Sequence, residues 1–210
     1  MAVFPSERDI LLIEISDHSY SLEPAFLAYN FIEIPVEIIS AILFTVFTMV
    51  VVGLNTNATS FFSMAFSVFV LTNVGESIGI MFCSLVHHVG FSVSITNAVL
   101  GIFVVMSGFM SANMPVFLDR INRISPVSYV GRLMGINEFS ETVMFSCSSE
   151  EVAQNLCWYQ TGSDVLNILA VEGTNTFRYD QFWVYLGTAA GLLVIYRLLA
   201  YGILKMKTKT

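Results

Sequence analysis

The stretch from Ser107 to Phe139, SGFMSANMPVFLDRINRISPVSYVGRLMGINEF, decides how this chain folds. An apolar segment runs into Ser107-Gly108, and a polar stretch follows that is broken by proline and carries three arginines. Irregular backbone cannot face lipid, because each unpaired N–H or C=O group costs several kcal/mol in hydrocarbon. We therefore expect this stretch to lie within protein, in a water-filled vestibule or at the membrane interface.

The composition is that of a membrane protein. Of 210 residues, 55% are hydrophobic and only 12% are charged, whereas a soluble domain averages about 25% charged residues. The net charge of −7 gives no indication of a nucleic-acid partner. Residues 1–20 lack the basic and then apolar pattern of a secretory signal.

Four apolar stretches, residues 31–54, 61–86, 91–110 and 182–204, are each close to the ~20 residues that a bilayer core requires. An even number of spans places both termini on one side. Lys205, Lys207 and Lys209 place that side in the cytoplasm, since cytoplasmic loops carry the excess of positive charge. We therefore predict an all-α polytopic membrane protein, in a plasma membrane or an organelle membrane. Its predicted parts are a cytoplasmic segment (1–25), three transmembrane helices (26–110), an extracytoplasmic re-entrant segment and acidic loop (111–180), a last transmembrane helix (181–204) and a basic cytoplasmic tail (205–210).

The cysteines agree with this orientation. Cys147 and Cys157 lie in the predicted extracytoplasmic loop, where an oxidising compartment permits a disulfide, although two free thiols are the alternative. Cys83 falls inside a span and is expected to be a small buried apolar residue. Asn57-Ala58-Thr59 matches a glycosylation sequon, but its very short loop against the membrane favours an unmodified asparagine.

No motif for catalysis or metal binding is present in these residues. The sequence contains no phosphate-binding P-loop, no H-E-x-x-H helix, no C-x-x-C pair and no G-x-S-x-G elbow. His87 and His88 are adjacent and would point about 100° apart on a helix, whereas a metal site needs at least three converging ligands. We expect neither an enzyme nor a metal site on this chain.

Glu76 is an acid near the middle of a span, and such a charge is expected to face the bundle interior with a partner or to be protonated. Asn73, one turn earlier, is its nearest polar neighbour on the same face. Glu76 could contribute to a translocation path or a helix interface, or form only a structural hydrogen bond. Arg197 is expected to snorkel to the cytoplasmic interface, and a buried functional charge is the alternative. The rings of Tyr179, Trp183 and Tyr185 are expected to form an interfacial belt.

Several motifs occur in an order that resembles the C-terminal part of the membrane domain of an ATP-binding-cassette transporter of the G subfamily (ABC-2 type). Glu14 and Tyr20, in EISDHSY, resemble the segment that docks on the nucleotide-binding domain, and Glu7 offers an alternative register. The third span ends in Ser107-Gly108 like the fifth helix of that family. The stretches I-S-P-V-S-Y and N-E-F resemble two further motifs of that family, at 124–129 and 137–139.

The resemblance implies roles for several residues. Phe109 and Met110 would form a hydrophobic plug between an inner and an outer cavity, and Asn97, Gly101 and Val104 would line the inner cavity. Spacings of three and four place these last three on one helix face, although ordinary helix packing would use the same spacing. The cysteines at 147 and 157 fall in the disulfide region of the family.

The resemblance also implies the partners. The chain would work with a nucleotide-binding domain that holds ATP and magnesium, and with a second membrane domain as a homodimer or heterodimer. The cargo would be a lipid, a sterol or another amphipathic molecule. Only the third to sixth of six family helices have equivalents here, so we expect a fragment, a truncated reading frame or half of a split protein. The alternatives are a truncated or regulatory subunit that pairs with a full-length relative, and an unrelated channel or receptor.

Overall fold

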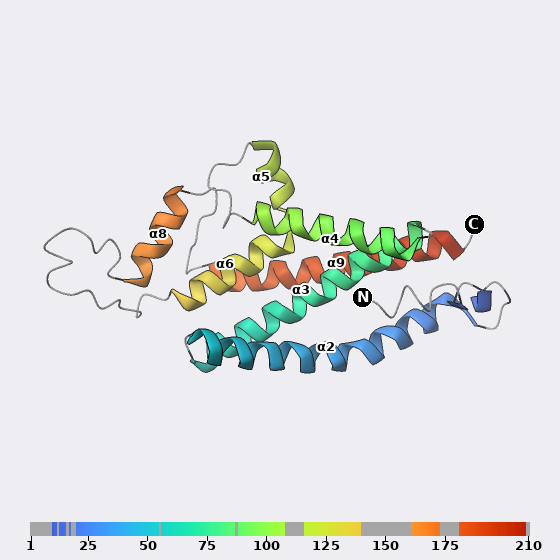
Figure 1. Cartoon of the computed structure of the whole chain (residues 1–210), viewed down its shortest axis with the longest axis horizontal. Coiled ribbons are helices and arrows are strands. Elements are labelled where there is room, and N and C mark those ends of the chain that lie inside the picture. Colours follow the sequence, from blue (N-terminus) through green and yellow to red (C-terminus); the bar gives the residue numbers. More distant parts are fainter. Residues whose placement is uncertain are drawn as a thin grey trace, which may run out of the picture.

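A computed structural model describes residues 10–11, 13–15, 17, 20–54, 56–86, 88–107, 116–139, 161–172 and 181–208. The helices are α2 (Leu22–Val52), α3 (Ala58–Leu85), α4 (Val89–Met106), α5 (Val116–Asn122), α6 (Pro126–Glu138), α8 (Gly162–Glu172) and α9 (Phe182–Thr208), as Figure 1 shows.

Four of these helices, α2, α3, α4 and α9, are long and apolar enough to cross a membrane. This confirms the predicted all-α polytopic membrane fold. The largest difference lies at the start of α2, which begins at Leu22 and continues through Pro35, whereas the apolar stretch begins at residue 31 and the predicted transmembrane part at residue 26. Glu23 and Pro24 in the first turn explain the early start, because an acid and a proline both suit the first turn of a helix. The helix therefore begins before its apolar part does.

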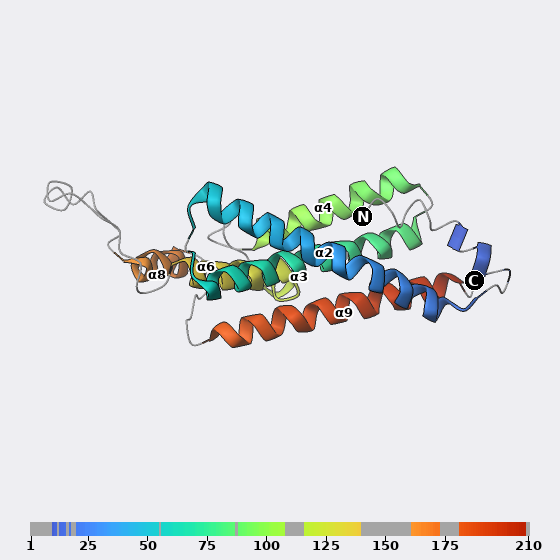
Figure 2. The ribbon, with the colours of Figure 1, turned by 90° about the horizontal axis from the view of Figure 1, so that it is seen from below.

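Helix α3 is the centre of the bundle. It packs against α2, α4, α6 and α9, and in Figure 2 α3 and α6 lie between α9 on one side and α2 and α4 on the other. One core cluster joins three of these helices through the buried side chains of Val70, Val74, Ile78, Val130, Ala189 and Tyr196. Burial of about half of α3 inside the bundle fixes which of its faces can contact lipid.

Helix α6 is inserted between spans and does not lie on the surface. It packs against both α3 and α9, and the Tyr196 hydroxyl donates a hydrogen bond to the Ile124 carbonyl at 3.3 Å. Tyr196 lies about 21 Å along α9 from Phe182, at 1.5 Å per residue. The turn before α6 therefore reaches the middle of a span, with Ser125 and Pro126 buried. Helix α6 is thus enclosed by other helices, whereas the turn before it is only partly covered, since Ile124 is 58% exposed.

Candidate functional site

A polar cluster lies inside the bundle around Glu76, and we call the side chains of Tyr29, Asn30, Glu76 and Arg197 the inner polar cluster. The Glu76 carboxylate accepts a hydrogen bond from the Tyr29 hydroxyl at 2.6 Å. Its other oxygen lies 2.8 Å from Nη1 of Arg197, and only 13% of the Arg197 side chain and 6% of the Glu76 side chain are exposed. One carboxylate thus joins α2, α3 and α9.

Arg197 has further contacts in the same place. Its Nε donates to the Asn30 side-chain oxygen, and its guanidinium lies 5.8 Å from the centre of the Phe26 ring, a cation–π distance. The prediction that Arg197 snorkels to the interface is therefore wrong. An arginine inside a span turns to a carboxylate when one is within reach, because a paired charge avoids the cost of an isolated one.

Asn73 is not the partner of Glu76. Its side-chain amide donates to the carboxyl group of Glu37 on α2, and both side chains are buried. The sequence interpretation missed Glu37. A signal was present, because Glu37, Ala41, Thr45 and Met49 recur every four residues and form the buried stripe of α2. Glu76 therefore lies at a helix interface, which is one of the alternatives that its position left open.

The predicted cavity residues lie together on α4 and face away from the bundle. Asn97, Gly101 and Val104 are all exposed. A Cβ atom added at Gly101 would meet no heavy atom within 4 Å. The structure thus brings these three residues onto one open face of α4. That this face lines a cavity stays a prediction.

The predicted docking segment lies against the end of the bundle where α9 ends, and we use the name inner end for it. Leu11 and Ile15 pack on the core cluster that includes Leu22 and Leu204. Tyr20 donates a hydrogen bond of 2.5 Å to the Glu14 carboxylate, and both side chains are exposed. This hydrogen bond, with smaller contributions from burial and the Glu14 charge, raises the pKa of the Tyr20 hydroxyl above its usual value.

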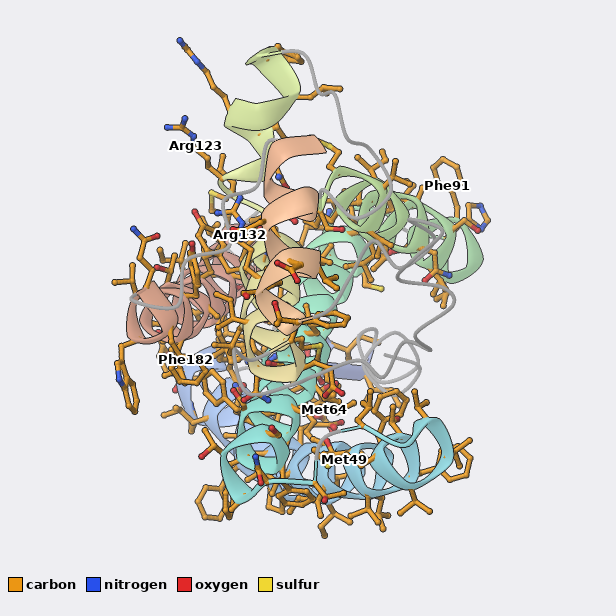
Figure 3. All side chains as sticks on the ribbon, turned by 90° about the vertical axis from the view of Figure 1, so that its left-hand side faces the viewer. Met49, Met64, Phe91, Arg123, Arg132 and Phe182 are labelled. Atoms are coloured by element: carbon orange, nitrogen blue, oxygen red, sulfur yellow. The ribbon has the colours of Figure 1, made fainter. Side chains whose placement is uncertain are left out.

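At the other end of the bundle, a pocket of about 350 Å³ lies between α6 and the hairpin of α2 and α3. Met49, Met64 and Phe139 contribute to its lining, and Figure 3 looks onto this end with Met49 and Met64 labelled. Nearby, the Arg132 guanidinium lies 5.7 Å from the centre of the Tyr129 ring and 5.8 Å from that of Tyr185. The contact with Tyr185 attaches α6 to the first turns of α9.

Other predicted residues have different outcomes. Trp183 is exposed as an interfacial residue should be, but Tyr185 is buried and donates to the Gln181 side chain, so the belt prediction is wrong for Tyr185. Cys83 is buried, as predicted. Asn57 is an exposed residue that precedes α3 as its N-cap, and glycosylation there stays untested. The residues outside the described ranges, whose predicted roles also stay predictions, are Glu7, Phe109, Met110, Cys147, Cys157 and Tyr179.

Comparison with known proteins agrees with this architecture. Residues 1–139 match the ABC-2 type transporter family, and the chain belongs to that family. It is 33% identical over 208 residues to an uncharacterized ABC transporter ATP-binding protein/permease of Saccharomyces cerevisiae, covering 99% of this chain and 16% of that protein.

Plant relatives are also similar. ABC transporter G family member 21 of Arabidopsis thaliana is 24% identical over 200 residues, which cover 94% of this chain and 28% of that protein. Member 23 of the same family is 26% identical over 210 residues, which cover 99% of this chain and 32% of that protein. The chain thus spans about a sixth to a third of the length of these relatives. It is an integral membrane part of the ABC-2 type with G family homologues.

Proposed function

We propose that this chain forms the transmembrane part of an ATP-driven exporter. In this proposal a nucleotide-binding domain holds ATP and magnesium, and a second membrane domain pairs with this one. The cargo is a lipid, a sterol or another amphipathic organic molecule. Family membership supports transport as the general activity, and the open face of α4 is the observation that carries the proposal furthest.

That face requires an occupant other than lipid tails. Asn97 is exposed in the middle of an apolar span, and a polar side chain at that depth normally faces a bundle interior or a water-filled cavity. Gly101 and Val104 extend the same face with open space at the glycine. A cavity between two membrane domains would give Asn97 polar contacts and would present an apolar wall to an amphipathic cargo.

The docking segment supports coupling to ATP. Leu11 and Ile15 hold it against the bundle, while Glu14 and Tyr20 remain exposed for a nucleotide-binding domain to contact. In this proposal both termini lie in the cytoplasm, and α6 enters from the opposite side. ATP can drive alternation only if it binds two conformations of the transporter with different affinity. The docking segment is the place where that difference would reach the membrane helices.

The test compares two exposed glycines that both have open space around them, Gly101 on α4 and Gly191 on α9. In the complete transporter, Gly101→Trp should lower cargo efflux by at least about tenfold, because an indole would fill the cavity wall. Gly191→Trp should leave efflux unchanged, because its side chain would face lipid. Efflux from vesicles and protein amount are measured together. If both variants export normally, the cargo does not pass along α4.

A further inference from the structure

We infer that the groove at the inner end of the bundle is a binding site for a glycerophospholipid, with an acyl chain in the groove and the phosphate at Lys207. The groove has a volume of about 470 Å³, which lies within the roughly 300–1,000 Å³ of ligand pockets. It is formed by the docking segment, by α2 and by α9. This inference goes beyond transport and does not depend on it.

Small side chains on α2 create the groove. Pro24, Ala25 and Ala28 line it together with Tyr20 and Leu204. The rings of Phe26 and Tyr201 are in contact, with their centres 5.4 Å apart, and they join α2 to α9. A larger side chain at Ala28, which is exposed, would therefore fill the groove without disturbing the core.

The position of the groove favours a lipid over a soluble ligand. Its walls are mainly apolar, and Ile32 extends them towards the middle of the membrane. Its other end lies beside Leu204, one residue before Lys205 in the last turns of α9. Positively charged residues at the end of a span lie at the level of the lipid headgroups. The groove thus runs from the headgroup level into the hydrocarbon, along the path of an acyl chain.

Lys207 is the cation that suits the phosphate. It is exposed and lies three residues after Leu204, so both are on the same side of α9, one turn apart. Lys205 has a different partner, because its ammonium lies 2.8 Å from the Glu23 carboxylate. The Glu14 carboxylate likewise accepts the Tyr20 hydroxyl. These two acids are therefore engaged with the protein, and a phosphate would give the Lys207 ammonium an anionic partner.

A bound acyl chain would also touch the supports of the inner polar cluster. Phe26 and Tyr29 line the groove, and the same two residues contact Arg197 and Glu76 respectively. A ligand that binds only the folded protein stabilises it by mass action. Phospholipid should therefore raise the thermal unfolding midpoint of the complete protein, and this readout needs neither ATP nor cargo.

The experiment measures lipid binding by native mass spectrometry of the complete protein, without ATP. Phosphatidic acid, which is anionic, is compared with a diacylglycerol that has the same tails but no phosphate. Ala28→Trp should weaken binding of both lipids by about tenfold or more. The matched control is Leu27→Trp, because Leu27 is 68% exposed, adjacent to Ala28 and absent from the groove. Equal binding by these two variants would overturn the inference.

The headgroup contact has its own test. A lysine near the membrane surface contributes about 1 kcal/mol towards an anionic headgroup, so phosphatidic acid should bind about fivefold more tightly than the diacylglycerol. Lys207→Gln should remove that difference and leave diacylglycerol binding unchanged. A preference for phosphatidic acid that survives in Lys207→Gln would overturn the phosphate assignment. Unchanged lipid binding in every variant would mean that another part of the complete protein covers the groove. That result would overturn the inference of a lipid site there.

Discussion

Helices α3 and α4 are neighbouring apolar spans that differ in how far they are buried. Each is an apolar span with one asparagine in its interior, Asn73 or Asn97. In the most apolar part of α3, 56% of the residues are buried, against 17% in α4. Asn73 and Glu76 of α3 have partners inside this chain, whereas the open face of α4 leaves Asn97 exposed to its surroundings. Sequence polarity alone thus does not separate a structural asparagine from one that is available for function.

The largest effect is expected from removing Arg197. Arg197→Leu would leave the Glu76 carboxylate without its cation inside the bundle, and breaking a buried pair in this way costs about 3–5 kcal/mol. The thermal unfolding midpoint of the complete protein in detergent should fall sharply. Glu76→Leu combined with Arg197→Leu should recover most of the loss, because no uncompensated charge remains.

The control is Lys205→Gln at the exposed pair with Glu23. That pair has the same 2.8 Å separation, but its side chains are 41% and 49% exposed, and exposed ion pairs stabilise little. The thermal unfolding midpoint of the Lys205→Gln variant should stay close to that of the parent protein. If Arg197→Leu and Lys205→Gln unfold at the same temperature, burial of the inner polar cluster does not matter to stability, and the contrast between α3 and α4 loses its basis.

The four spans, the inserted break and the buried Cys83 could be predicted from the sequence, because hydropathy and backbone hydrogen bonding act locally. The partners of Glu76 and Arg197 could not. These two residues are 121 positions apart and meet only because α9 packs on α3. Asn73 was placed correctly on the Glu76 face, but its amide turns to Glu37 on another helix. Spacing along one helix shows which residues share a face, and only packing shows what that face meets.

An intermediate effect is expected at Asn73. Asn73→Leu would deprive the buried Glu37 carboxyl group of its amide donor, and an unsatisfied buried polar group costs about 1–3 kcal/mol. The free energy of unfolding, measured in detergent, should fall by about this amount. Replacing both residues, with Asn73→Leu and Glu37→Leu together, should cost less than the single change, because no polar atom is then left without a partner. A larger loss in the double variant would mean that the pair does not stabilise α2 against α3.

The smallest effect on stability is expected from the same substitution on α4. Asn97→Leu removes an exposed side chain for which no hydrogen bond is found among the described residues, so the free energy of unfolding should change by at most about 0.5 kcal/mol. Efflux should nevertheless change if Asn97 faces the cargo path, and measuring both quantities on one preparation separates the two roles. A loss of stability as large as that of Asn73→Leu would show that α4 depends on Asn97 for packing. Two asparagines in neighbouring spans would then be equivalent, and exposure in a single chain would not be a guide to the transport path.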